Sequence, residues 1–519
     1  MLLLCNAPRT FPYQPYWADG ISVGNFDNST NWQELSGIAT PNLDANSAWL
    51  WIESDSPANM IGGVSATNPA TKFVLTLTGQ TAMVDLEDIT SVRFNGVNYL
   101  YGMDMGNNGN GADSRGSGID MRIFRIVEPT ITGSNISTSN FIEINAAFPG
   151  VNGPTLRDAE SSFVDPVDGK LYIIIKRDAV QKVYSLAFAN QIAGATQTLV
   201  YEGAMTSLPE SRTVALTTTP CYAVSACMSK SGKEILVKNY SGIYYFPRVL
   251  GTDTVIQALQ KALVSVSYVG GGTLPTPKTS HPNAEPQGEG VCFDFNDQDY
   301  FTNSEYNSTE GSSATAYPMF RYERLAKAPT TATFQDGVSP TAGYTGTVTT
   351  YIWGTNPDTD RSAETTFVVD FTSGNPTDDR RGLVKWDLSS IPTTARVVSA
   401  YIEMYISAEG QGIKAYRMLV PWVASSTFNT LVGGVNNDGV KASVAESFRN
   451  GINLDTVTAT MWKTNALVAD VQFWVSNPSL NQGLLMKGLD ESAGGDGMQF
   501  DSKAGTTASR RPKLVIKYV

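Results

Sequence analysis

A pattern of short strands recurs between Ser36 and Leu325. Three copies open with Asp or Gln followed two positions later by Glu, and each copy continues to an aromatic-rich strand and then to polar residues. In all there are five copies, which begin at Ser36, Asp85, Asp158, Ser225 and Gln287. Segments of several short strands that repeat every roughly 50 to 70 residues are typical of the four-stranded blades of a β-propeller. We therefore expect a β-propeller of five or six blades over residues 31–327.

The first residues lack the pattern of a secretory signal. Only three leucines follow Met1 before polar and proline residues, and no later stretch approaches the roughly 18 apolar residues of a membrane-spanning helix. We expect neither a signal peptide nor membrane insertion. Because the last blade would otherwise keep an unpaired edge, residues 1–30 are expected to provide a closing strand or a docking arm.

The composition changes after the repeats. Residues 328–350 are rich in Thr, Ala, Gly and Pro, which predicts a linker. Later segments alternate apolar and polar residues, for example T-T-F-V-V-D-F, G-L-V-K-W-D-L and K-L-V-I-K-Y-V. Such strands predict a β-sandwich in which one face of each sheet is buried. The expected fold class is all-β, with a propeller followed by a jelly-roll sandwich over residues 351–519.

Two resemblances extend this prediction. The stretches S-G-I-A, D-L-E-D-I, Y-L-Y-G-M-D-M-G-N-N and D-A-E-S-S-F resemble a family of uncharacterised bacterial propellers related in pattern to phytase-like and esterase-like propellers. That family's D-I-G-D-N loop stands here as Asp104–Asn108, with one acid replaced by an amide. The stretches R-R-G-L-V-K-W-D-L-S-S-I-P, A-R-V-V-S-A-Y-I-E-M-Y-I-S and S-R-R-P-K-L-V-I-K-Y-V are similar to the DNRLRE-type jelly-roll domain, whose own charged motif is partly matched by Asp378–Arg381. The second resemblance implies display and attachment, not a defined reaction.

Carboxylates are the candidate site residues. Glu87, Glu160 and Glu289 occupy equivalent places in three repeats and should face one axis, because the first strand of each blade lines the central channel. Asp104 follows the second strand of its repeat. These four residues are the candidate ligands of a hard cation, with calcium as the expected ion. We weigh this against hydrolytic catalysis and against the interpretation that we favour, structural closure of the ring. The further acidic candidates are Asp85, Asp88, Asp158 and Glu305, and Lys176 and Arg177 are expected to neutralise the ring.

Other chemistries find little support. The only histidine is His281, and no G-x-S-x-G motif accompanies it, so a catalytic triad is disfavoured and no catalytic residue is assigned. The net charge is −12 and the sequence contains no basic run, so we expect no nucleic-acid partner.

Cysteines and tryptophans are expected in the core. Cys5, Cys221, Cys227 and Cys292 are interpreted as reduced thiols, with a Cys221–Cys227 bridge as the alternative. The later tryptophans are interpreted as core aromatics rather than sugar-stacking platforms; these are Trp353, Trp422, Trp462 and Trp474.

The predicted function is attachment. Two architectures that favour binding, together with the missing signal peptide, suggest a bacteriophage virion protein of a tail fibre, tail tip or capsid surface, assembled in the host cytoplasm. Its partners would be other virion proteins, bound through the N-terminal segment, and a host glycan or surface protein, with several copies on each particle. The alternatives are an exported phytase-like or esterase-like hydrolase and a bacterial surface adhesin.

Overall fold

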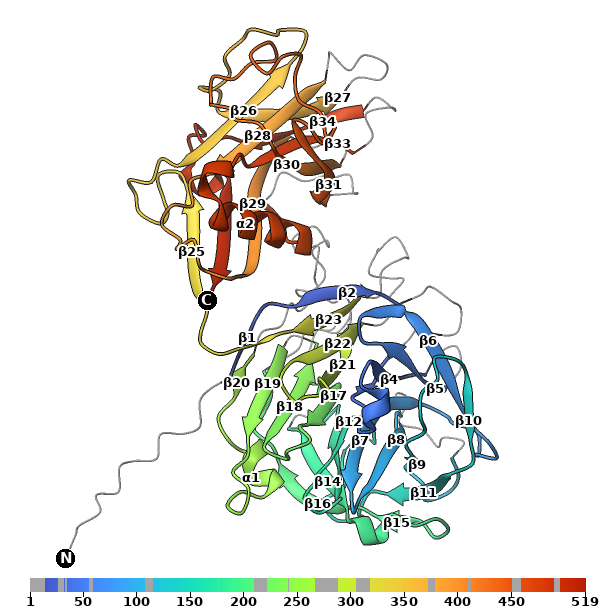
Figure 1. Ribbon diagram of the computed structural model, residues 1–519. Coiled ribbons are helices and arrows are strands. Elements are labelled where there is room, and N and C mark those ends of the chain that lie inside the picture. The colour runs from blue at the N-terminus through green and yellow to red at the C-terminus, as the bar shows by residue number, and fades with distance from the viewer. Residues whose placement is uncertain are drawn as a thin grey trace, which may run out of the picture.

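The computed structural model describes residues 15–519 except 27–31, 33–34, 56–58, 108–114, 156, 179, 210–221, 241, 267–287, 305–317, 372–378, 409, 411, 450–458 and 490–494. The described chain is nearly all β-structure, as the sequence predicts, and it forms two modules (Figure 1). No helix in these ranges is long and apolar enough to span a membrane.

The first module is a five-bladed β-propeller (Figure 1). Blade 1 contains β3 (Ile38–Ala39), β4 (Trp49–Ser54), β5 (Met60–Ser65), β6 (Asn68–Leu77) and β10 (Ile136–Thr138). Blade 2 contains β7 (Leu86–Phe94), β8 (Val97–Asp104), β9 (Met121–Val127), β11 (Phe141–Ala147) and β15 (Gln197–Thr198). Blade 3 contains β12 (Ala159–Val164), β13 (Leu171–Ile175), β14 (Lys182–Leu186) and β16 (Val200–Ala204). Blade 4 contains β17 (Ser225–Met228), β18 (Glu234–Asn239), β19 (Gly242–Pro247) and β20 (Val264–Ser265), and α1 (Val255–Leu259) precedes β20. Blade 5 contains β21 (Gly288–Phe293), β22 (Tyr300–Ser304), β23 (Pro318–Tyr322) and β2 (Ile21–Asn25).

Local sequence explains how each blade forms. Between β7 and β8, Asn95 and Gly96 both have positive φ, 50° and 78°, which is the geometry of a tight hairpin turn. The apolar residues of neighbouring blades then pack against one another in continuous clusters, such as the one shared by Tyr101, Ile173 and Tyr184. The five inner strands β3, β7, β12, β17 and β21 contact one another in a closed ring around the axis.

An N-terminal strand closes the propeller. Strand β2 pairs antiparallel with β23, placing Ile21 opposite Arg321, and so completes the last blade. Strand β1 (Tyr16–Trp17) pairs with β24 (Arg324–Leu325) just outside it. The first part of the segment expected as a docking arm, residues 1–14, lies outside the described residues.

The second module is one curled antiparallel sheet with a main core cluster and a second apolar cluster that includes Leu383, Trp422 and Leu485. It contains β25 (Thr330–Gln335), β26 (Thr347–Trp353), β27 (Thr366–Phe371), β28 (Arg380–Trp386), β29 (Val397–Ala408), β30 (Ile413–Met418), β31 (Ala442–Arg449), β32 (Ala459–Trp462), β33 (Leu484–Gly488), β34 (Gly495–Asp501) and β35 (Lys513–Tyr518). Helix α2 (Asn465–Ser476) contributes Leu467, Val471 and Trp474 to the main core cluster.

The prediction of a linker over residues 328–350 is corrected, because residues 330–335 and 347–350 belong to strands of this sheet. Strand β25 pairs with β35 over its whole length, from Thr330 opposite Tyr518 to Gln335 opposite Lys513, and β26 pairs with β28. The partner of β25 lies far away in the sequence, so composition alone gave no sign of the pairing. The connection between the modules is therefore short, from Ala326 to Pro329.

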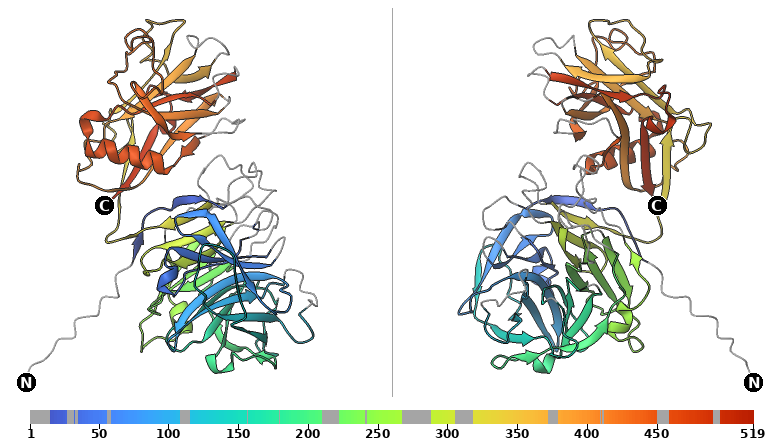
Figure 2. Two further views of the ribbon diagram at one scale, coloured as in Figure 1. Left: turned by 45° about the vertical axis from the view of Figure 1, so that its right-hand side comes forward. Right: turned by 180° about the vertical axis from the view of Figure 1, so that it is seen from behind.

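The two modules meet beside blade 5, where the chain between β1 and β2 touches both (Figures 1 and 2). The carboxylate of Asp19 accepts hydrogen bonds from Lys463 at 2.8 Å, Lys517 at 2.7 Å and Ser399 at 2.8 Å. Burial disfavours the charge of Asp19, but the two ammonium groups outweigh this effect and hold its pKa well below the ordinary value. Ala18 packs beside this contact against Leu325 of the propeller side and Val398 of the sheet.

Candidate functional site

Three inner strands bring three glutamates together at the propeller axis. Glu87, Glu160 and Glu289 are each the second residue of their strands, β7, β12 and β21. All three are buried, and they offer carboxylate oxygens that lie within 4.8 Å of one another. At that separation two full charges repel by about 3 kcal/mol even with an effective dielectric constant of ~20. This inner triad therefore requires protons or positive charge to be stable.

Lys176 supplies positive charge to the inner triad. It directly follows β13, is buried, and forms an ion pair with Glu160. Burial favours the neutral amine, but Glu160, Glu289 and Glu87 outweigh it and raise the pKa of Lys176. Tyr240 donates a hydrogen bond from its hydroxyl to Glu289. The neutralising role that the sequence suggested for Lys176 is thus present in the structure.

Burial also controls the protonation of the glutamates. It raises the pKa of Glu87 well above the usual value, and the neighbouring Glu160 adds to this shift. The pKa of Glu160 is likewise raised by burial, against the opposing charge of Lys176. One ammonium therefore does not balance all three carboxylates, and the inner triad retains protons or excess negative charge.

Asp104, the fourth predicted ligand, points into a different network. Its carboxylate accepts hydrogen bonds from Arg115 Nε at 3.0 Å and from the backbone amides of Asp85 at 2.8 Å and Val84 at 3.2 Å. Arg115 is fully buried and also donates to the carbonyl of Gly106 at 3.0 Å. Among the described residues Asp104 belongs to neither group of converging carboxylates. Arg115 was not among the residues predicted from the sequence, because it lies in a Gly/Asn/Ser-rich stretch that resembles an ordinary surface insertion.

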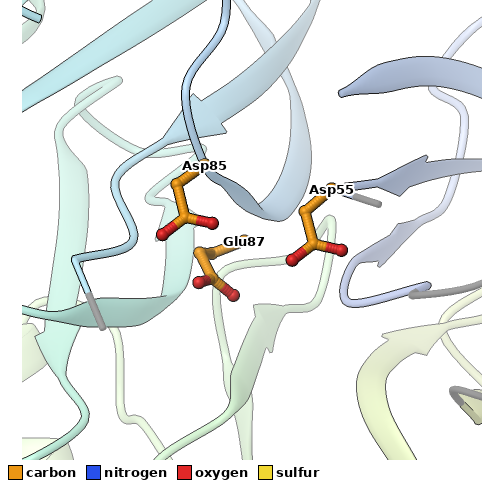
Figure 3. Close-up of side chains that lie close together, drawn as sticks. All are labelled: Asp55, Asp85 and Glu87. Carbon is orange, nitrogen blue, oxygen red and sulfur yellow. The ribbon is translucent and has the colours of Figure 1, made fainter. Parts of the chain in front are cut away.

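A second group of carboxylates shares Glu87 and lies nearer the solvent. Asp55, which follows β4, and Asp85, which precedes β7, are both partly exposed, and their oxygens lie within 4.8 Å of each other and of Glu87. Figure 3 shows the three carboxyl groups of this outer triad facing the same small space. Burial, against the opposing charge of Arg115, raises the pKa of Asp85 to about 6. Asp85 was a sequence candidate, whereas Asp55 was not among the residues predicted from the sequence.

Two further acids are buried in the first two blades, Asp88 on β7 and Glu53 on β4. Asp88 is fully buried and accepts hydrogen bonds from the amide of Ser162 at 2.6 Å and its hydroxyl at 3.0 Å. Glu53 of β4 is also fully buried, and neither of its carboxylate oxygens makes a hydrogen bond of ordinary geometry with the described residues, although the backbone amide of Gly37 is close enough to lower its pKa. Burial raises the pKa of Glu53, and the charges of Asp55 and Asp88 add to the shift. The E-S-D stretch at the end of β4 was the sequence signal that could have identified it.

The remaining sequence candidates lie apart from these triads. Asp158 forms an ion pair with Arg177 and accepts a hydrogen bond from the amide of Asn107 at 2.8 Å. Cys5, Cys221, His281, Glu305 and Asp378 lie outside the described residues.

The opposite end of the channel holds a small polar cavity of about 50 Å³. Its lining includes Thr40, Ser91, Lys230 and the two thiols of Cys227 and Cys292. Both cysteines are buried and free, and burial raises the pKa of each. These two thiols therefore act as core residues, as expected.

The tryptophans of the second module do not form an open aromatic platform. Trp422, Trp462 and Trp474 are buried, as predicted. Trp353 is partly exposed, but the guanidinium group of Arg380 lies over its ring at 4.3 Å and that of Arg361 at 5.4 Å from the ring centroid. Stacking of a sugar on this ring would have to compete with these cations.

Comparison with known proteins gives a fold-level likeness. No protein-family model matches the chain, and no curated protein matches its sequence. Solved structures similar to it are β-propeller-like proteins. A luciferin-regenerating enzyme has 9% identity and a TM-score of 0.32, and the match covers 60% of this chain and 96% of that one. An auxiliary nutrient binding protein from Bacteroides thetaiotaomicron has 10% identity and a TM-score of 0.31, with 61% and 79% covered. A gluconolactonase from Xanthomonas campestris has 11% identity and a TM-score of 0.28, with 60% and 98% covered.

Proposed function

We propose that the protein is a bacteriophage virion component, in a tail fibre, tail tip or capsid surface, that attaches the particle to a host glycan or surface protein. The observation that carries this proposal is the junction of the two modules. Tyr16, Ala18 and the C-terminal Val519 all pack there, beside Leu325 and Val398. A particle that holds the chain at this junction leaves the outer faces of both modules available for contact with a host.

Strand β31 and the segment before it supply a candidate contact surface in the second module. Val432, Val440 and Val444 are 82%, 70% and 69% exposed, which is unusual for apolar side chains so close in sequence. Lys441 holds this region together, because its ammonium donates to the carbonyls of Leu431, Val432 and Gly434 at 2.8 Å each. An ordered apolar rim of this kind suits recognition of another surface.

Ion-paired carboxylates of the propeller give additional support to a binding role. Glu160, Asp158 and Asp104 are each paired with a buried or half-buried cation, an arrangement that stabilises the ring.

Adsorption to cells tests the proposal. Labelled full-length protein should sediment with susceptible bacteria or bind their purified polysaccharide, and removal of residues 330–519 should weaken this binding while the propeller keeps its circular dichroism spectrum. Replacing Val432 and Val440 by Ser should weaken adsorption, whereas replacing the exposed Val151 of the propeller should not. Absence of binding to every tested host surface would count against attachment, and immunogold labelling of cell envelopes rather than particles would favour an adhesin.

One observation favours a hydrolase as the second candidate. Asp85 is partly exposed, lies beside Asp55 and Glu87, and has a pKa of about 6, which suits a general base near neutral pH. A hydrolase would release phosphate from phytate or acid from small esters in the presence of Ca²⁺, and Glu87→Gln would abolish this. Turnover that survives Glu87→Gln would exclude the axial site as its source.

A further inference from the structure

Two guanidinium groups lie over one indole ring in the second module. Trp353 is the last residue of β26, and it is paired with Arg380, the first residue of β28. The guanidinium carbon of Arg380 is 4.3 Å from the centroid of the Trp353 ring, and that of Arg361 is 5.4 Å from it. Arg361 also lies over the ring of Tyr351, at 4.6 Å. Two positive charges are therefore gathered at a single tryptophan.

Three N–H groups of this cluster have no acceptor. Trp353 Nε1, Arg361 Nε and Arg380 Nε are buried and make no hydrogen bond within the described ranges. Buried N–H groups in native proteins are almost always paired with an acceptor from the protein or from a bound molecule. Three such donors on side chains that gather at one indole ring therefore indicate a ligand that supplies oxygen atoms.

Two carboxylates offset part of the positive charge. Arg361 Nη1 donates to Glu364 Oε1 at 2.8 Å and to the hydroxyl oxygen of Tyr351 at 2.8 Å. Asp370 Oδ2 lies 3.3 Å from Arg380 Nη1. Because a guanidinium group has five N–H donors, these contacts leave both arginines with further hydrogen-bonding capacity. The side chains of Arg361 and Arg380 are 11% and 30% exposed, so both can be reached from solvent.

The donors of this cluster fit an oxyanion. The fork of a guanidinium group matches two oxygens of a carboxylate or phosphate group, and hydrogen bonds to an ionised acceptor are stronger than those to a neutral one. A neutral sugar would have to displace the two cations from the indole ring before it could stack there. An acidic sugar does not need to displace them, because its charged group binds the cations themselves.

The cluster also adjoins the candidate contact surface. Pro357 and Asp358 belong to the loop that leads from Trp353 to Arg361. The backbone amide of Asn429 donates to the carbonyl of Pro357 at 3.0 Å, and its side-chain amide donates to Asp358 at 2.8 Å. Asn429 is only three residues before the exposed Val432 in the sequence. The loop and the contact surface are therefore joined by hydrogen bonds.

We propose that Trp353, Arg361 and Arg380 bind the oxyanion of an acidic glycan, either a carboxylate or a phosphate group. The oxygens of this group accept hydrogen bonds from the two guanidinium groups and from the indole N–H. The choice of a glycan as the ligand rests on the attachment function proposed above, whereas binding of the oxyanion itself does not depend on that function.

Titration of the full-length protein with two anions tests the site. Isothermal titration calorimetry with trigalacturonate measures binding of a carboxylate, and titration with glycerol 3-phosphate measures binding of a phosphate. The methyl ester of trigalacturonate and glycerol are the matched neutral controls. At least one anion should bind with a millimolar or lower Kd, and its neutral counterpart should give no heat of binding.

Substitutions at Arg380 connect this binding to the cluster. Arg380→Gln should weaken binding of the anion by at least about tenfold, because it removes a charged hydrogen-bond donor. Arg449→Gln removes the same charge from an ion pair elsewhere in the second module and should leave the affinity unchanged. If Arg380→Gln fails to fold, Arg380→Lys provides the comparison, since it keeps the charge but loses the fork and should weaken binding to a smaller extent.

Three results would overturn the proposal: no binding of either anion at millimolar concentration, equal binding of an anion and its neutral counterpart, or unchanged affinity in the Arg380 variants. Adsorption to host cells without affinity for either anion would also overturn it, while attachment would stand. Anion binding that is lost in Arg380→Gln, without adsorption to any tested cell, would support this site and count against attachment.

Discussion

Gly106 lies where a side chain would collide with Glu87 and Asp85. It lies just after the end of β8, where the carboxylate of Asp104 accepts a hydrogen bond from Arg115. This segment therefore holds the Asp104 carboxylate against Arg115, and at Gly106 it leaves room for the carboxylates of the outer triad. Gly106 is not among the glycines with positive φ, so it is needed because a side chain would not fit there and not because of its backbone conformation.

Substitution of this glycine should be costly. Gly106→Ala forces the buried carboxylate of Glu87 to move and should lower the free energy of unfolding by about 1–3 kcal/mol, the range for overpacking. Urea denaturation measures this, and Gly150→Ala is the matched control because a Cβ there meets no atom within 4 Å. Equal stability of the two variants would show that the outer carboxylates are free to rearrange.

The raised pKa values make stability depend on pH. Burial raises the pKa of Asp85 from 3.8 to about 6, and it raises that of Glu87 in the same direction. A carboxyl group whose pKa is higher in the folded state contributes stability below the unfolded pKa, and this contribution is lost as the pH rises through the folded pKa. In chelator, the melting temperature should therefore fall between about pH 4 and about pH 7.

Asp85→Asn serves as the control for this prediction. The variant has no proton to lose at that position, so its melting temperature should fall less over the same range of pH. Asp19 does not interfere, because its lowered pKa places its titration below this window. A wild-type melting temperature that rises across the window would contradict the burial of these acids.

Strand β2 shows how a single element can complete a domain. It joins the first described residues to the last blade through β23, so the ring is closed by strand pairing between distant parts of the chain. The register shifts between Ser22 and Gly24, and Gly24 has a φ of 131°, a conformation that side chains rarely adopt. This bulge lets the closing strand pass Pro69 of blade 1, whose Cδ would be 3.1 Å from a Cβ at position 24.

The bulge should be sensitive to substitution. Gly24→Val places a β-branched residue at positive φ and should destabilise the propeller by about 1–3 kcal/mol. Differential scanning calorimetry should report a lower melting temperature for the propeller, whereas Ile21→Thr in the same strand, at a 37% exposed position, should change it little. If both variants melt like the wild type, closure by β2 contributes little to stability.

The contact at Asp19 joins the two modules of the molecule. One carboxylate from the propeller side binds Lys463 and Lys517 of the curled sheet, and the neighbouring Asn465 donates to the carbonyl of Ser22 at 3.0 Å. The short connection from Ala326 to Pro329 joins the modules at the same place. The two modules are therefore expected to behave as one body in solution.

Removal of this carboxylate should uncouple the modules. Asp19→Ala removes the carboxylate that Asp19 provides to the buried Lys463, and loss of one partner of such a pair costs about 3 kcal/mol. A single calorimetric transition should separate into two, and protease should cut at 326–329 more rapidly. Glu323→Gln is the control, because its ion pair with Arg396 is exposed and contributes little. Unchanged calorimetry in Asp19→Ala would mean that other contacts hold the modules together.

The sequence by itself determined the elements that depend on neighbouring residues. Alternating apolar residues and turns such as Asn95–Gly96 predict the strands of each blade, and the equal placement of Glu87, Glu160 and Glu289 predicts their convergence, because a repeated unit repeats its geometry. All three glutamates do meet at the axis. The all-β class follows from the same local patterns.

Only the tertiary structure decided the contacts between residues far apart in the chain. Pairing of β25 with β35 turned an expected linker into part of a sheet, and pairing of β2 with β23 fixed the number of blades at five. Asp104 forms an ion pair with Arg115 instead of lying among the three glutamates, and Lys176 forms an ion pair with Glu160 of the inner triad. Asp55 lies beside Asp85 and Glu87. Strand pairing and charge compensation depend on which residues are close in space, and local sequence patterns do not show which distant residues become neighbours.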